Sequence, residues 1–353
     1  MKPQKGLGTV VGLSLLALLL VVVQGSALAA QHEDQRFFAA THSHNDYYQP
    51  RPLYDALESG MGGIEPDVFY VEIPFRDDQG NERTMRELYV AHDWEEIEGV
   101  DPEWRTIGTL RETYLDPLWR IYHERGGTIY TQGTLLLHVD MKTDTEMTWR
   151  LLHNTLQNYP GMVTTFDVEN RVVIQGPVTV YTNAEPEPEV LAEYPVLHAT
   201  ADGRFGDIYD PSTWESDAYR DRAWRMPIVS SNLRAYSDLE QFFDFNAPYE
   251  EIVEQYGEHY PDLTVDNLVD TLRREGWALA NELMADGTIE VSDYLVEQMV
   301  EADRLGRTHG HLMRFWASPD EPWFWDIVAP LDNVVVATDR PRDLAAYLQA
   351  QDE

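Results

Sequence analysis

Three short clusters of histidine, carboxylate and lysine side chains are the part of this sequence best suited to chemistry. In each cluster two such residues are two positions apart, so on a β-strand their side chains lie on the same side. Each cluster follows or interrupts an apolar run, which predicts a place at the end of a buried strand. The clusters are His42-Ser43-His44 followed by Asn45, Glu65-Pro66-Asp67, and Asp140-Met141-Lys142.

The carboxylates of Glu65, Asp67 and Asp140 indicate a divalent metal site. Carboxylates that meet inside apolar runs repel one another and are costly to bury without a cation. A ligand set made only of oxygens favours Mg²⁺ or Ca²⁺ over zinc. Lys142 would neutralise an anionic ligand beside the ion, and a phosphate group suits this arrangement because its oxygens bind both metal and lysine.

Histidines near these carboxylates are suited to proton transfer. The pKa of histidine lies near neutrality, so one imidazole can accept a proton from a nucleophile while another donates one to a leaving oxygen. His42 and His44 stand together at the first cluster. His138 precedes the third cluster, and its strongly apolar surroundings favour the interpretation of a core histidine with satisfied hydrogen bonds.

The elements that must position these residues are apolar runs alternating with longer amphipathic stretches, which predicts βα units and a parallel sheet. Most of the runs end in polar residues, and eight such parallel strands predict an α/β fold, a (β/α)8 TIM barrel with its chemistry at the C-terminal ends of the strands. The predicted strands are residues 37–43, 62–70, 133–141, 171–181, 195–200, 226–231, 311–317 and 333–338.

One segment departs from this alternation, and two helices are readable from their ends. Residues 71–92 flank a polar turn, which predicts a hairpin excursion after strand two that ends at His92 and Asp93. A capping box formed by Thr143 and Glu146 predicts a helix over 144–159. Pro341 in a first turn predicts a helix over 341–350.

Composition narrows the function classes. The chain has 353 residues, 43% of them hydrophobic, which supports a full core and excludes wholesale disorder. Its formal charge of −36 repels phosphate backbones and excludes general nucleic-acid binding. Without cysteine, the chain has no disulfide framework, thiolate metal site or cysteine nucleophile. Lysine occurs only at positions 2, 5 and 142, and this bias favours adaptation to high salt, with drift toward arginine codons as the alternative.

Residues 1–29 are predicted to be a signal peptide. A positive start precedes an apolar run from Leu13 to Val23, and Ala27-Leu28-Ala29 fits a cleavage site. The run is shorter than the roughly 20 residues of a spanning helix, and an uncleaved anchor is the alternative. We therefore expect an exported protein, periplasmic or extracellular, with one catalytic domain over residues 30–353.

These motifs and their order resemble the phospholipase-C-like phosphodiesterase superfamily, which includes glycerophosphodiester phosphodiesterases, phosphatidylinositol-specific phospholipases C and sphingomyelinase-D-type enzymes. The His-Arg-Gly start of the glycerophosphodiester phosphodiesterases is missing, and His44-Asn45-Asp46 stands in its place, so Arg51 and Arg314 are both candidates for the family's phosphate-binding arginine. The matching segments are Ser43-His44-Asn45, Glu65-x-Asp67, His92-Asp93, Asp140-Met141-Lys142-Thr143, Phe315-Trp316 with Asp320, and Thr338-Asp339-Arg340-Pro341.

The resemblance implies a TIM barrel that hydrolyses phosphodiesters with one Mg²⁺ or Ca²⁺ ion. It implies that His44 and His92 are the catalytic acid and base. The expected substrate is a phosphodiester small molecule or a lipid head group, met in part through transient membrane contact. The implied metal ligands are Glu65, Asp67, Asp140 and Asn45, and the residues expected to bind substrate are Lys142, Arg314 and Trp316.

Two other classes stay open at this point. A zinc hydrolase of the amidohydrolase type would begin with His42-x-His44 and recruit His138, His198 and Asp339, but it would leave the Glu65 and Asp67 pair without a role. A non-catalytic barrel that binds lipid head groups or sugars would use some of the ten tryptophans.

Overall fold

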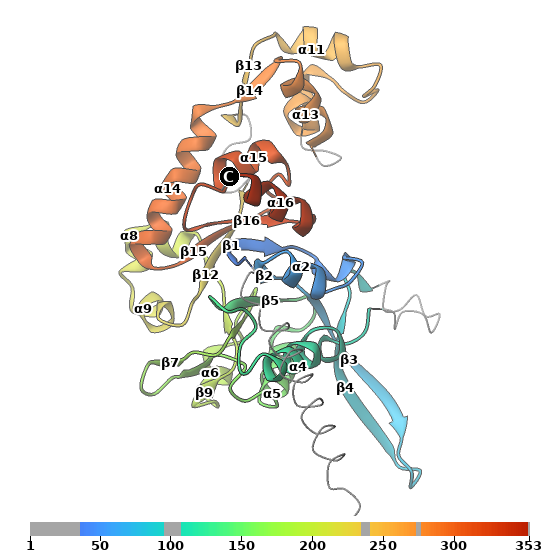
Figure 1. Cartoon of the computed structure of the whole chain (residues 1–353), viewed down its shortest axis with the longest axis vertical. Coiled ribbons are helices and arrows are strands. Elements are labelled where there is room, and N and C mark those ends of the chain that lie inside the picture. Colours follow the sequence, from blue (N-terminus) through green and yellow to red (C-terminus); the bar gives the residue numbers. More distant parts are fainter. Residues whose placement is uncertain (1–35, 95–106, 234–240, 273–276, 352–353) are drawn as a thin grey trace, which may run out of the picture.

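The computed structural model describes residues 36–94, 107–233, 241–272 and 277–351, and its main sheet is built mostly from parallel strands (Figure 1). Neighbouring strands follow the order β10-β8-β5-β2-β1-β16-β15-β12-β11. This confirms the α/β class with a mostly parallel sheet, whereas closure into a barrel stays a prediction. The strands are β1 (Phe38–Ser43), β2 (Met61–Ile64), β5 (Leu135–Met141), β8 (Val178–Thr182), β10 (Thr200–Ala201), β11 (Gly203–Arg204), β12 (Ile228–Asn232), β15 (Leu312–Trp316) and β16 (Val334–Thr338).

Each predicted strand overlaps a strand of this sheet, but three of the predicted runs are divided or interrupted. The run at 62–70 is interrupted after β2, because Pro66 has no N–H to donate to a ladder. In the run at 171–181, β7 (Val172–Ile174) instead pairs antiparallel with β6 (Thr165–Asp167). The run at 195–200 divides into β9 (Val196–Leu197), which pairs with β6, and β10 in the main sheet.

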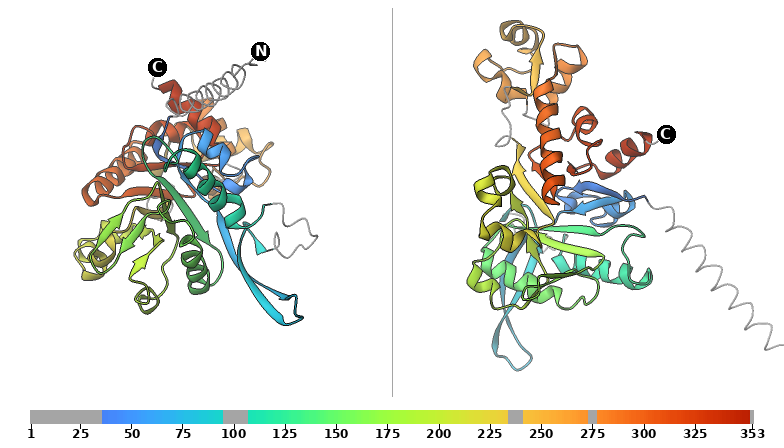
Figure 2. Two further views of the ribbon diagram at one scale, coloured as in Figure 1. Left: turned by 60° about the horizontal axis from the view of Figure 1, so that its bottom comes forward. Right: turned by 90° about the vertical axis from the view of Figure 1, so that its left-hand side faces the viewer.

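The predicted hairpin excursion is present and is longer than expected. β3 (Asp67–Arg76) and β4 (Glu82–Val90) pair antiparallel along their whole length and project from the body of the molecule (Figures 1 and 2). Asp77 closes the turn by accepting hydrogen bonds from the backbone N–H of Gln79 at 3.0 Å and of Asn81 at 2.9 Å. The excursion therefore starts at Asp67, one of the predicted metal ligands, rather than at residue 71.

Helices lie between most strands. The helix predicted over 144–159 is α5 (Thr145–Leu156), and its N-cap is Asp144, which accepts from the N–H of Met147 at 2.8 Å. The predicted Thr143 cap is wrong, because the Thr143 hydroxyl instead accepts from the N–H of Tyr70 in β3. The helix predicted over 341–350 is α16 (Pro341–Gln351), which follows α15 (Pro322–Val328) after β15. The remaining helices between β1 and β12 are η1 (Asp46–Tyr48), α2 (Tyr54–Glu58), η3 (Arg111–Leu115), α4 (Asp116–Glu124), α6 (Pro188–Leu191), α7 (Gly206–Tyr209), α8 (Pro211–Trp214) and α9 (Asp217–Ala223).

In the sequence between β12 and β15, which are neighbours in the sheet, the chain forms a small lobe. Its strands β13 (Phe243–Phe245) and β14 (Ile289–Val291) pair antiparallel beside short helices, and α14 (Asp293–His309) leads back to the sheet (Figure 1). Trp323 in α15 joins the lobe to the body by donating to Asn281 Oδ1 at 3.0 Å. The short helices are α11 (Tyr249–Tyr256), η5 (Val265–Asn267), α12 (Leu268–Leu272) and α13 (Ala278–Ala285).

The predicted signal peptide lies outside the described residues. Within them, no helix combines the length and the apolar character needed to cross a bilayer.

Candidate active site

Neighbouring strand ends bring the three predicted carboxylates together. β2 lies between β1 and β5, and Asp67 at the start of β3 is the register partner of Asp140 in β5. Glu65, Asp67 and Asp140 each place one carboxylate oxygen within 4.8 Å of the others. The structure thus gathers the acidic residues of two distant sequence clusters, and their role as metal ligands stays a prediction.

Asp67 has one oxygen in use and one without a partner. Its Oδ2 accepts from Lys142 Nζ at 2.8 Å and from the hydroxyl of Tyr47 at 2.8 Å. Its Oδ1 is buried and accepts no hydrogen bond. Burial, together with negative Glu65 and despite Lys142, raises the pKa of Asp67 to about 6. A carboxylate oxygen in this situation is suited to a cation.

Lys142 bridges two of the carboxylates. Its Nζ lies 2.8 Å from Asp67 Oδ2 and 2.8 Å from Asp140 Oδ2. Burial disfavours the charge on Lys142, but these two hydrogen bonds outweigh burial and raise its pKa. The amide of Asn183 donates to the other oxygen of Asp140 and accepts from the N–H of Met141 at 3.0 Å, which holds the end of β5 in place.

Glu65 is surrounded by two histidines and an arginine. Its Oε2 lies 2.6 Å from His42 Nε2 and accepts from the guanidinium of Arg314, and its Oε1 lies 3.3 Å from His138 Nδ1. Burial favours the protonated acid, but Arg314 and the histidines outweigh it and hold the pKa of Glu65 well below its usual value. Burial and Arg314 lower the pKa of His42 to about 3, so this imidazole is neutral.

Two groups of residues have the spacing of metal ligands. One is His42, Glu65 and His138, and the other is Glu65, Asp67 and Asp140. The carboxylate group fits a hard cation, because it offers only oxygen ligands and includes the unpartnered Asp67 Oδ1. His198, the further zinc ligand considered from the sequence, instead lies 3.4 Å from His153 Nε2 through its Nδ1.

His44 is the histidine that opens to solvent beside this group. Its Nδ1 lies 2.8 Å from Asp339 Oδ1, and its side chain is 37% exposed. Burial lowers the pKa of His44, but the hydrogen bond to Asp339 and negative Glu65 outweigh burial and raise it. Asp339 is held in turn by Gln49, whose amide donates to its carbonyl oxygen at 2.7 Å. This pairing fixes the orientation of the His44 ring, and its role in proton transfer stays a prediction.

His92 and Asn45 lie near the same strand ends. The ring of His92 is 6.4 Å from that of Tyr48, and its Nδ1 is 3.2 Å from Asp93. The N–H of Ala91 donates to the carbonyl of Asp67 at 3.3 Å, which places the residue before His92 beside the start of β3. Asn45 has a left-handed backbone with φ of 45° and accepts from the hydroxyl of Tyr47 at 3.0 Å.

A cavity of about 220 Å³ borders His44, Arg314, Trp316, Asp320 and Asp339. Trp316 is 45% exposed at its rim, whereas Arg314 is 4% exposed and reaches inward to Glu65. The structure therefore brings Arg314 into the site. The other candidate arginine, Arg51, pairs with side chains of α2 and lies with that helix.

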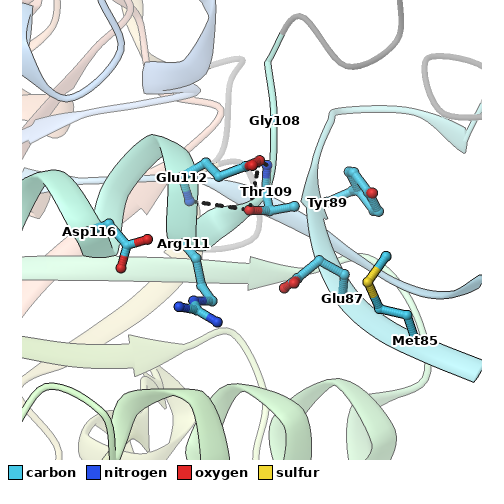
Figure 3. A pocket seen from close by; sticks show the side chains of 8 residues that line it. All are labelled: Met85, Glu87, Tyr89, Gly108, Thr109, Arg111, Glu112 and Asp116. Atoms are coloured by element: carbon cyan, nitrogen blue, oxygen red, sulfur yellow. Dashed lines mark hydrogen bonds between the residues drawn. The ribbon is translucent and has the colours of Figure 1, made fainter. Parts of the chain in front are cut away.

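A larger cavity, of about 500 Å³, lies at the base of the hairpin (Figure 3). Met85, Glu87 and Tyr89 of β4 form one wall, and Thr109 to Asp116 form the other. Thr109 and Glu112 close a turn there, with the Thr109 N–H and hydroxyl each 3.1 Å from Glu112 Oε2. None of the predicted site residues lines this cavity.

Several site residues were missed or misinterpreted in the sequence. His138 is not a satisfied core histidine, because its Nε2 is buried without a hydrogen-bond partner while its Nδ1 faces Glu65. Tyr47 and Asn183 carried no signal, because Tyr47 lies in the short helix η1 after the first cluster and Asn183 follows β8, a strand without a cluster. His42 carried one, because it stands two residues before His44 at the end of a predicted strand.

Residues 35–194 match the family model described as the AIM6-like phosphodiesterase domain. The protein named "Altered inheritance of mitochondria protein 6" from Candida glabrata is 30% identical over 190 residues, which is 47% of this chain and 43% of that protein. The protein of the same name from Lachancea thermotolerans is 28% identical over 187 residues, 48% of this chain and 39% of that protein. The chain thus spans less than half the length of these two curated relatives.

Among solved structures, the glycerophosphodiester phosphodiesterase from Agrobacterium tumefaciens aligns with a TM-score of 0.38 and 14% identity. The alignment covers 88% of this chain and 97% of that chain. The family match ends at residue 194, so Arg314, Trp316 and Asp339 come from the part of the chain beyond it.

Proposed function

We propose that this chain, whose residues 35–194 form an AIM6-like phosphodiesterase domain, hydrolyses a phosphodiester small molecule or lipid head group with the help of one Mg²⁺ or Ca²⁺ ion. The observation that carries the proposal is the meeting of Glu65, Asp67 and Asp140 beside Lys142, with one buried oxygen of Asp67 left unpartnered.

The charges of the site suit a monoanionic substrate. Around the proposed ion, the three carboxylates are paired with two permanent cations, Lys142 and Arg314, and His42 is neutral, so these six groups together carry one negative charge. A divalent ion reverses this balance and leaves one positive charge. A phosphodiester carries one negative charge and neutralises it, which favours diesters over dianionic monoesters.

Glu65, Asp67 and Asp140, with Asn45 nearby, are the residues proposed to hold the ion. When bound, it would polarise the phosphoryl group and lower the pKa of the attacking hydroxyl. Lys142 would stabilise negative charge on the phosphate as it develops, from a position already fixed by two hydrogen bonds. Arg314 and Trp316 border the cavity beside His44 and would contact the substrate there.

Proton transfer is assigned to His44 and His92. His44 is oriented by Asp339 and partly open to solvent, as a general acid or base must be. His92, which follows the hairpin's return arm, is the proposed second histidine, and the two share the roles of general acid and general base. Closure of the sheet into a barrel, export, transient membrane contact and adaptation to high salt complete the proposal on sequence grounds.

The test is hydrolysis of bis-p-nitrophenyl phosphate by chain stripped with a chelator and reloaded with Ca²⁺ or Mg²⁺. We expect activity to require the ion and to fall about 10²–10⁴-fold in His44→Ala. His259→Ala changes an exposed histidine of the lobe and is the matched control. A double variant of His44 and His92 that turns over like the wild type would refute the assignment, and phosphorus NMR on a diester panel would identify the substrate.

A zinc hydrolase is the second candidate, because His42, Glu65 and His138 also have ligand spacing. Metal analysis separates the two, since about one zinc per chain with no response to Ca²⁺ or Mg²⁺ would favour it.

A further inference from the structure

His42 is buried in the site, with close neighbours at both nitrogens of its ring. Its side chain is 1% exposed, and its Nε2 lies 2.6 Å from Glu65 Oε2. An ionised carboxylate only accepts hydrogen bonds, so His42 Nε2 carries the hydrogen and donates it to Glu65. A nitrogen that donates in this way has no lone pair to offer a metal ion.

The opposite side of the His42 ring faces Gly63 in β2. A Cβ at position 63 would lie 2.7 Å from His42 Nδ1 and 3.2 Å from the carbonyl oxygen of Thr41. Contacts shorter than about 3.0 Å force something to move, so any side chain at position 63 would displace the imidazole. Gly63 therefore makes room for His42, and it does so two residues before Glu65 on the same chain segment.

Arg314 disfavours a cation in the space between the two buried histidines. Its guanidinium donates to Glu65 Oε2, the same oxygen that accepts from His42, and its NH1 lies 3.3 Å from His138 Nδ1. A metal ion shared by His42, Glu65 and His138 would sit against this permanent positive charge, in a region where charges are poorly screened. The histidine group therefore has a different use.

We propose that His42, accommodated by Gly63, is a positioning residue that fixes the carboxylate of Glu65 toward the metal held with Asp67 and Asp140. This inference rests on the proposed metal site. It assigns His42 no contact with substrate or metal. Residues that orient metal ligands typically change metal affinity about 10–100-fold when they are removed.

The experiment measures binding of Ca²⁺ and Mg²⁺ alone to the chelator-stripped full chain by titration calorimetry. We expect His42→Ala to weaken binding of these ions by about 10–100-fold. His42→Gln places an amide N–H at a similar reach and is expected to restore affinity to within about threefold of wild type. Gly63→Ala, which moves His42 without removing any carboxylate, is expected to resemble His42→Ala. Gly206→Ala is the matched control, because a Cβ there meets no atom within 4 Å.

Three results would overturn the inference: unchanged affinity in both His42→Ala and Gly63→Ala, a loss in His42→Gln as large as in His42→Ala, or no metal binding by the wild type. If His42→Ala fails to fold, the metal affinities of His42→Gln and Gly63→Ala, measured by the same titration and compared with wild type, decide the question. The readout is independent of hydrolysis. A chain that binds the ion in a His42-dependent way but cleaves no diester would refute the proposed function and leave this inference standing.

Discussion

Replacing Lys142 with methionine is expected to strengthen metal binding and weaken catalysis at the same time. Lys142 Nζ lies 2.8 Å from both Asp67 and Asp140, the two carboxylates that the ion would use. Methionine keeps most of the side-chain volume and removes the charge. The ion then no longer competes with an ammonium group, whereas the phosphate loses a cation that stabilises it.

The structure sets the size of the effect on stability. Without Lys142, two carboxylates with oxygens within 4.8 Å of each other have no cation between them in the metal-free protein. Two unit charges at that distance repel by about 3 kcal/mol at an effective dielectric constant of 20. Because Lys142 and Asp140 are partly exposed, we expect Lys142→Met to lower the free energy of unfolding by about 2–3 kcal/mol without metal.

Added metal should reverse this loss. An ion that binds only the folded chain stabilises it in proportion to the logarithm of its concentration over its Kd, so tighter binding gives a larger shift in Tm. We expect Ca²⁺ or Mg²⁺ to raise the Tm of Lys142→Met more than that of wild type, with a Kd at least about tenfold lower, a difference of about 1.4 kcal/mol. Hydrolysis of bis-p-nitrophenyl phosphate at saturating metal should fall about 10²–10³-fold.

The assays are thermal unfolding with and without metal, calorimetric titration, and steady-state hydrolysis. Arg150→Met is the matched control, because it removes the same charge from α5, where Arg150 pairs with Glu146 and Glu193. Surface pairs of this kind contribute about 0–1 kcal/mol and should not affect metal binding. The reasoning fails if Lys142→Met binds metal more weakly than wild type, or if its metal-free Tm is unchanged.

Three further outcomes are expected. Tyr181→Phe removes a fully buried hydroxyl that has no hydrogen-bond partner, so unfolding in urea should show equal stability or a gain of up to about 1 kcal/mol, and a clear loss would contradict this. Asp55→Ala should cost about 2–4 kcal/mol at pH 7, because buried Asp55 accepts from Arg342 and so links α2 to α16. Burial raises the pKa of Asp55, but its pairing with arginine outweighs burial and lowers it. The contribution of Asp55 to the free energy of unfolding is therefore full above the unfolded pKa of about 3.9 and disappears as pH falls through the lower folded pKa. The urea midpoints of wild type and variant should converge in acid. Asp339→Asn should keep the His44 contact but remove its charge, which lowers the pKa of His44. The limb of the pH–rate profile that His44 controls, acidic if it is the base and alkaline if it is the acid, should then move to lower pH, whereas an unshifted profile would show that Asp339 does not act through His44.

The part of the site built from β1, β2 and β5 was predictable from the sequence because local patterns determine it. Apolar runs placed the strands, and a spacing of two residues placed Glu65 with Asp67, and Asp140 with Lys142, on one side. Parallel neighbours then bring such strand ends to one edge. The register of Asp67 with Asp140 is the long-range outcome of those short-range signals.

The remainder depended on contacts that no local pattern encodes. Asp339 is separated from His44 by 295 positions, and its helix-starting context gives no sign that it accepts from an imidazole. His138 is buried as expected, but its hydrogen bonding could not be predicted, because its unpartnered Nε2 and the approach of Arg314 and Glu65 to its Nδ1 depend on long-range packing. The hairpin was recognised from its turn, but its start at Asp67 depends on how Pro66 interrupts the strand.

The bridging ammonium group has a practical consequence for chemical labelling. Lys142 is the only lysine among residues 36–351, so an acylating reagent meets a single ε-amino group in that part of the chain. Its two carboxylate partners keep it protonated and therefore slow to react. An ion that draws those carboxylates away would leave the amine more nucleophilic. The rate at which the peptide that contains Lys142 gains mass would then report whether the metal site is occupied, without a substrate and without any engineered probe.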